Sequence, residues 1–194
     1  MARFACLCVL VLLSMCAPRN PAGRGLFSMD SLLRAQATRL SDAQASLTKQ
    51  ILFGAKQEEI TLSPADTTAW LKELEAFVVI DALNKPINRD RYVINDTTDS
   101  KSNLRVRAFS TSDDLPVTSV RIYYHHVPSS IRKIEASYIE HNGLYKTNQM
   151  LSMEFNDLNG APVMTSYSIV GGQKMFLDDT VQYDIKGKVR LEKK

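Results

Sequence analysis

The chain has 194 residues, 44% of them hydrophobic, and its 24 basic and 21 acidic residues give a formal net charge of +3. This nearly balanced charge argues against nucleic acid as a partner, because nucleic-acid-binding domains are markedly basic. The length allows one domain with one hydrophobic core of ordinary size.

The first residues have the pattern of an export signal. Arg3 is the only charge among the first eighteen residues, and Phe4 to Leu13 form an uninterrupted apolar run. Such a run is too short to cross a bilayer as a helix, whereas its length is typical of a cleaved signal. Residues 1–15 are therefore predicted to be a signal peptide.

The stretch LLSMC, residues 12–16, resembles the processing site of bacterial lipoproteins, where Leu and two small residues precede a lipidated Cys. Leu13 and Ser14 fit this pattern, and Met15 departs from it. The alternative is an ordinary cleaved signal, but the following residues lack a good small-x-small site. Cys6 and Cys8 would leave with the signal, so that Cys16 would be the only thiol and no intrachain disulfide could form. Cys16 is predicted to carry a lipid that anchors the protein to a membrane, so the membrane is a predicted partner.

Residues 16–25 are predicted to form the anchor cysteine and a tether, since APRNPAGRG is rich in Pro and Gly. Residues 26–194 then form a single α+β domain. Its first element is a helix from Leu26 to about Ala45, because apolar residues recur at helical spacing and Asp30 or Ser31 can cap the start. Residues 46–62 fit either a continued helix or a hairpin that turns near Gly54, and alternation slightly favours the hairpin.

A second helix is predicted from Ser63 to about Leu83. Ser63 can cap it, Pro64 suits its first turn, and Asn84-Lys85-Pro86 ends it. From Arg91 onward the hydrophobic period is two, which predicts strands. Their turns are placed at Pro128 to Ser130, at Asn142-Gly143, in a three-residue loop Leu158 to Gly160, at Gly171-Gly172 and at Asp178-Asp179.

With these turns, one face of every strand is apolar and the other is polar. The predicted fold class is therefore α+β: N-terminal helices cover a curved antiparallel β-meander, which is an incomplete barrel or half-barrel. The sequence KGKVR near the C-terminus alternates charged with small or apolar residues. Lys186, Lys188 and Arg190 on its polar face form a possible interaction surface.

The residues that usually carry catalysis or bind metals do not converge. His125 and His126 are adjacent on a strand and point to opposite faces, and His141, which ends the next strand, lies at the opposite end of their hairpin. No serine lies in a Gly-x-Ser-x-Gly elbow, and the Asp113-Asp114 and Asp178-Asp179 pairs lie in turn-like contexts. We therefore expect no enzyme, no cofactor and no metal site.

Several short segments resemble a set of uncharacterised, lipid-anchored envelope proteins of Bacteroidota-type bacteria. The resembling segments are Trp70 to Phe77, Asp81, Asn84 to Pro86, Tyr167 to Lys174 and Tyr183 to Gly187. The resemblance covers most of the mature chain and implies export and anchoring in the cell envelope, in the periplasm or at the outer membrane. It carries over no catalytic residue.

The expected function is that of a non-enzymatic binding or structural module of the envelope, with an envelope protein as a possible partner. The alternative is a periplasmic carrier of a lipid or another hydrophobic ligand. In that case the ligand would lie against the apolar face of the sheet, lined by Tyr124, Tyr138, Met153, Phe155, Tyr167 and Ile169.

Overall fold

A computed structural model describes residues 27–175 and 179–191. They form one open antiparallel sheet of nine strands in the order β2-β1-β9-β8-β7-β6-β5-β4-β3, together with one long helix and three shorter helical segments. The strands are β1 (Ser46–Phe53), β2 (Lys56–Leu62), β3 (Val93–Thr98), β4 (Arg105–Ser110), β5 (Val117–Tyr124), β6 (Ile131–His141), β7 (Tyr145–Leu158), β8 (Ala161–Met175) and β9 (Thr180–Arg190). The helical segments are α1 (Met29–Asp42), α2 (Thr67–Glu73) and the 3-10 segments η1 (Glu75–Asn84) and η2 (Arg89–Arg91).

Strands β3 to β9 follow one another as the predicted meander, and the hairpin β1–β2 joins it at its C-terminal end. Strand β1 pairs with β9, and Leu47 lies opposite Val189. Strand β9 is thereby an interior strand, while β2 and β3 form the two edges.

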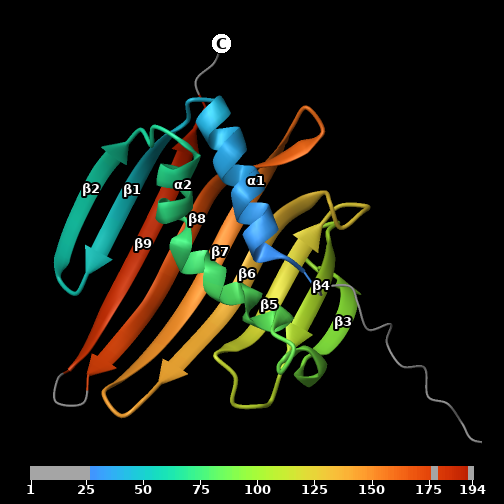
Figure 1. Cartoon of the computed structure of the whole chain (residues 1–194), viewed down its shortest axis with the longest axis vertical. Helices are drawn as coiled ribbons and strands as arrows, with labels where there is room; N and C mark the ends of the chain where they lie inside the picture. Colours follow the sequence, from blue (N-terminus) through green and yellow to red (C-terminus); the bar gives the residue numbers. More distant parts are fainter. Residues whose placement is uncertain (1–26, 176–178, 192–194) are drawn as a thin grey trace, which may run out of the picture.

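The helices pack on one face of the sheet and leave part of that face uncovered (Figure 1). Gln36 of α1 fixes the packing, because its Oε1 accepts from the Met164 backbone N–H at 2.8 Å and its Nε2 donates to the Pro162 carbonyl at 3.0 Å. Phe77 of η1 meets the Tyr167 ring edge to face, with centroids 5.7 Å apart. Within the described residues, no helix combines the length and hydropathy that a bilayer crossing requires.

The N-terminal elements agree with the sequence except at their caps. Helix α1 begins at Met29 with Ser28 as its N-cap, and residues 46–62 form the hairpin rather than a continued helix. Helix α2 begins three residues after Pro64, because the Asp66 side chain accepts from the Ala69 N–H at 2.8 Å and Ser63 does not cap it. The second predicted helix is thus a short α-helix followed by 3-10 turns that end at Asn84.

The turn at Asn142-Gly143 was predicted at the right place but in the wrong register. A two-residue turn would pair Ile134 with Leu151, whereas the strands pair Ile134 with Met153 and Ala136 with Leu151. The loop is longer because the Asn142 side chain accepts from the N–H groups of Leu144 and Tyr145. The error is an even number of residues, so every side chain keeps its predicted face.

At Asn159-Gly160 the predicted three-residue loop is wrong. The turn has two residues, both with positive φ, of 54° and 81°, and Leu158 pairs with Ala161. The hydrophobic pattern requires the strand register to shift by one residue, and this shift occurs as a β-bulge on β8. Glu154 pairs with Ser166 and Phe155 pairs with Met164, so Thr165 has no partner on β7. Beyond the bulge, Met153 pairs with Tyr167 on the apolar face.

The predicted turn at Gly171-Gly172 is also wrong, because β8 runs straight through both glycines to Met175. A Cβ at Gly171 would lie 2.7 Å from the Tyr183 hydroxyl, and one at Gly172 would lie 2.9 Å from the Gln182 amide. These glycines therefore allow close side-chain approach from β9. Strand β8 pairs directly with β9, with Lys174 opposite Thr180, so Val181 lies opposite Gln173 rather than Phe176. Asp178 lies outside the described residues.

Candidate ligand-binding groove

The two faces of the sheet differ in chemistry, because side chains alternate along each strand. Leu47, Tyr167 and Val189 are buried on the face that carries the helices. Their neighbours in sequence, among them Thr48, Ser166 and Lys188, point to the opposite face, which we call the outer face. In the middle of the outer face, polar side chains from four adjacent strands lie side by side.

The strand pairing arranges these side chains in two rows that cross the sheet. In the first row Thr48, Lys188, Ser166 and Glu154 lie opposite one another in turn. In the second row the corresponding residues are Gln50, Lys186, Ser168 and Ser152. Both rows have a lysine on β9 and a serine on β8, so the short side chains of β8 lie beside the long side chains of β9.

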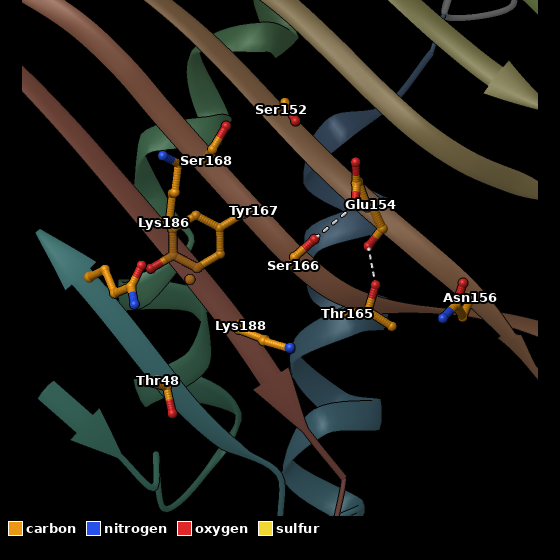
Figure 2. A pocket seen from close by; sticks show the side chains of 12 residues that line it. Thr48, Ser152, Glu154, Asn156, Thr165, Ser166, Tyr167, Ser168, Lys186 and Lys188 are labelled. Atoms are coloured by element: carbon orange, nitrogen blue, oxygen red, sulfur yellow. Dashed lines mark hydrogen bonds between the residues drawn. The ribbon is translucent and has the colours of Figure 1, made fainter. Parts of the chain in front are cut away.

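This difference in side-chain length hollows the outer face into an open groove of about 610 Å³ (Figure 2). Figure 2 shows the serines of β8 between the lysines of β9 and Glu154 of β7. Its lining residues are Thr48, Gln50, Ser152, Glu154, Asn156, Thr165, Ser166, Tyr167, Ser168, Lys186, Gly187 and Lys188. We call it the polar groove.

The charged groups of the polar groove are only partly neutralised. The Lys186 Nζ lies 2.7 Å from Asp184 Oδ2, whereas Lys188 has no ion-pair partner among the described residues. Across the groove, Glu154 Oε2 accepts a hydrogen bond from the Ser166 hydroxyl at 3.1 Å. The groove therefore presents a free ammonium group on one side, a carboxylate on the other and hydroxyls between them.

Beneath the groove, on the helix face, a polar cluster ties α2 to the sheet. Glu73 accepts the Tyr167 hydroxyl and lies 2.5 Å from the Lys49 Nζ. Burial, followed by the neighbouring Glu73 carboxylate, raises the pKa of Tyr167 above its ordinary value. The Tyr167 ring lies over Gly187, where a Cβ would be only 2.2 Å from Cε1. Gly187 is thus a site of close approach between β9 and the Tyr167 ring.

Five of the six residues proposed to line a hydrophobic cavity are packed in the core. Tyr124, Met153, Phe155, Tyr167 and Ile169 are all less than 10% exposed. Tyr138 is half-buried, and its hydroxyl donates to Glu140 at 2.7 Å. The structure brings these residues to one face, as predicted, but they pack against one another and the helices.

His141 ends β6 as predicted, but His125 and His126 lie in the turn after β5 rather than on opposite faces of a strand. The His125 and His126 rings stack with centroids 5.9 Å apart, and the exposed His141 Nε2 lies 3.9 Å from Asp114. Among the described residues, no three His, Cys, Asp or Glu side chains are grouped so as to hold a metal ion. Cys16 lies outside the described residues.

Of the three basic residues predicted as an interaction surface, Lys186 and Lys188 line the polar groove. Arg190 points to the same face one pair further along, opposite Ser46, and is not part of the lining. The predicted site residues did not include Glu154 or the serines of the groove, Ser152, Ser166 and Ser168. Alternation on β8 places Ser166 and Ser168 on the polar face, but recognising their proximity to Lys186 and Lys188 requires the direct β8–β9 pairing.

These features define the class of protein: an open antiparallel sheet with helices on one face and a polar groove on the other. Comparison of the chain with protein-family models, with curated proteins and with solved structures yields no match.

Proposed function

We propose that the protein is a non-enzymatic binding module of the bacterial cell envelope, anchored by a lipid on Cys16, and that it binds through the polar groove. The observation that carries the proposal is the position of Lys186 and Lys188 beside the hydroxyls of β8 in an open groove. The chemistry of the polar groove supports binding, because the groove offers hydrogen-bond donors and acceptors without the arrangement of nucleophile and base that catalysis requires.

The packing of the helix face supports the same proposal. Trp70, Phe77 and Leu83 are at most 1% exposed, and the residues beneath them form one continuous core with the sheet. Where the helices lie, this face is filled, and the open groove lies on the outer face.

The proposal is tested by retention of envelope components on the immobilised full-length protein. Envelope material from cells that make the protein is separated into protein, lipid and polysaccharide fractions, and each is passed over wild type, a Lys186→Gln/Lys188→Gln variant and a Lys101→Gln control. Lys101 is exposed in a loop outside the groove. We expect a component that wild type and Lys101→Gln retain and the double variant does not. Equal retention by all three proteins, or none, would contradict a binding role for the groove.

A second candidate is the carrier of a hydrophobic ligand, and the uncovered part of the helix face favours it. There Phe53 is 56% exposed, and Tyr183 and Ile185 are half-buried beside it on β9. In a half-barrel carrier the ligand would lie on this uncovered part rather than between the six core residues. Native mass spectrometry of protein purified from its own envelope distinguishes the two candidates: a co-purifying lipid that is lost in Phe53→Ser supports the carrier.

A further inference from the structure

The chemistry of the polar groove restricts what it can bind. Its lysines are donors only, its glutamate is an acceptor only, and its serine and threonine hydroxyls are both. A complementary ligand must therefore place a negative charge near β9, donors near Glu154 and groups of both kinds along β8. The groove crosses four strands, a span of about 14 Å at ordinary strand spacing, which suits an extended ligand.

From this arrangement we infer that the polar groove binds an acidic saccharide, an inference that rests on the proposed binding function. A carboxylate of the saccharide lies beside Lys188, within reach of the Thr48 hydroxyl. Its hydroxyl groups lie along Ser168 and Ser152 and donate to Glu154. Lys186 supplies a second cation one row away, about 6.5 Å along the strand.

The unpaired state of Lys188 is the first argument for a negative charge. Lys186 already has a carboxylate partner in Asp184, but Lys188 has none among the described residues. Its neighbours in the row, Thr48 and Ser166, are neutral. The Thr48 hydroxyl can donate to the same anion, whereas the Ser166 hydroxyl donates to Glu154 and can accept from a ligand hydroxyl. The Lys188 ammonium and the Thr48 hydroxyl thus lie side by side as donors for one anion, and Lys186 lies one row away.

The absence of apolar side chains from the groove surface is the second argument. Among the described lining residues, only Tyr167 is aromatic, and its hydroxyl points to the helix face, where Glu73 accepts it. Peptide partners bind mainly through buried aromatic and aliphatic anchors, and nucleic acids through stacking on aromatic rings. Membrane surfaces also require apolar side chains that insert. An acidic saccharide can be bound through hydrogen bonds and ion pairs, without an apolar side chain against each sugar unit.

The position of the groove is the third argument. It lies over β1, β9, β8 and β7, which are all interior strands, so their backbone groups are paired within the sheet. An extended peptide would find no free strand edge there to accept its backbone hydrogen bonds. A saccharide has no backbone amides that must be matched, and side-chain hydroxyls satisfy its hydroxyls directly.

The test measures binding of fluorescent oligogalacturonate to the full-length protein by anisotropy, with maltooligosaccharide as the neutral probe and poly-glutamate as the acidic peptide probe. We expect oligogalacturonate to bind, its affinity to fall as salt rises, and the other two probes to bind at least tenfold more weakly. Lys188→Gln should weaken binding about two- to fivefold, as expected for one exposed charge-assisted contact.

Two further variants distinguish binding that depends on the groove from binding that depends only on the net charge of the protein. Ser166→Ala/Ser168→Ala removes hydroxyls without altering charge and should also weaken binding severalfold, whereas Lys101→Gln removes the same charge as Lys188→Gln and should leave binding unchanged. Thermal unfolding of each variant checks that it is folded. Equal losses for Lys101→Gln and Lys188→Gln, or an unaffected serine variant, would overturn the assignment of the site.

The remaining outcomes concern the ligand. Poly-glutamate binding as tightly as oligogalacturonate would overturn the saccharide and identify an anionic peptide surface. No binding of oligogalacturonate would likewise overturn the saccharide. The binding function itself would then still be decided by the groove-dependent retention of envelope components, so the two failures are distinguishable.

Discussion

Gly187 shows how one residue connects the two faces of this sheet. On the helix face its missing side chain leaves room for the Tyr167 ring, whose hydroxyl reaches Glu73 of α2. On the outer face its neighbours Lys186 and Lys188 flank the polar groove. Because β9 pairs with both β1 and β8 here, a change at Gly187 affects the core and the geometry beneath the groove together.

Gly187→Ala is expected to lower the free energy of unfolding by about 1–3 kcal/mol, the usual cost of overpacking. The added Cβ would lie 2.2 Å from the Tyr167 ring, which packs against Phe77 and cannot move freely. Urea unfolding followed by fluorescence of Trp70 measures the change. Gly143→Ala is the control, since nothing lies within 4 Å of a Cβ there. Equal stabilities for the two variants would refute the role assigned to Gly187.

Tyr138 gives the domain a dependence on alkaline pH. Burial, and then its hydrogen bond to Glu140, raise the pKa of Tyr138 to about 12 from an ordinary value of 10.0. The native state thus favours the protonated phenol, whose contribution to stability is complete below pH 10 and is lost as pH rises to about 12. In Tyr138→Phe the stability should therefore fall less steeply over this range.

Chemical denaturation of both proteins at intervals from pH 8 to pH 12 measures this difference. The interval below pH 9 is the internal control, because there the difference between wild type and Tyr138→Phe should not vary with pH. Tyr145, whose hydroxyl also donates to Glu140, remains in both proteins. Parallel curves over the whole range would show that Tyr138 is not the titrating group.

At the scale of elements, the N-cap of α2 in the structure differs from the N-cap that the sequence pattern predicts. Ser63-Pro64 is a strong helix start by residue type, yet the helix begins at Thr67 with Asp66 as its cap. Asp66→Ala should lower the free energy of unfolding by about 1 kcal/mol, because the Ala69 N–H loses its acceptor. Ser63→Ala should change it little. Thermal unfolding of both variants decides between the two caps, and the reverse order would favour Ser63.

Which side chains face the core could be predicted, because period-two alternation survives even-numbered register errors. In β5, Val120, Ile122 and Tyr124 recur at every second position, and all three are at most 5% exposed. At the β7–β8 hairpin the hydrophobic pattern required the strand register to shift by an odd number of residues. The sequence does not indicate whether this shift occurs in the loop or within a strand. The chain uses a bulge at Thr165, and the side chains beyond it have the expected faces.

The pairing that forms the polar groove could not be predicted. Gly171-Gly172 has the composition of a turn, and only the tertiary structure shows that the Tyr183 and Gln182 side chains occupy the space above these glycines. The contact between β1 and β9 joins residues about 140 positions apart, and no local signal specifies it. Lys186 and Lys188 were identified from alternation alone. Their serine neighbours on β8 come from the β8–β9 pairing, Glu154 from the β7–β8 pairing, and Thr48 and Gln50 from the β1–β9 pairing.

At the scale of the whole molecule, the N-terminal hairpin closes onto the last described strand, so the polar groove is built from both ends of the chain. Thr48 and Gln50 come from β1, while Lys186 and Lys188 come from β9. The groove is therefore complete only when the N-terminal and C-terminal parts of the domain are both folded and paired.

The predicted anchor is tested by lipid labelling in a bacterium that processes lipoproteins. Cells that make the full chain should incorporate labelled palmitate into it, and Cys16→Ser should abolish the label and shift the protein from the membrane to the soluble fraction. Cys8→Ser is the matched control, because Cys8 lies in the predicted signal and would be removed with it. Stable anchoring requires more than one acyl chain, so loss of the thiol that begins modification should release the protein entirely. Palmitate incorporation that persists in Cys16→Ser would exclude this anchor. Absence of label in the wild type would also contradict it, and Met15 before the cysteine would then explain the failure of processing.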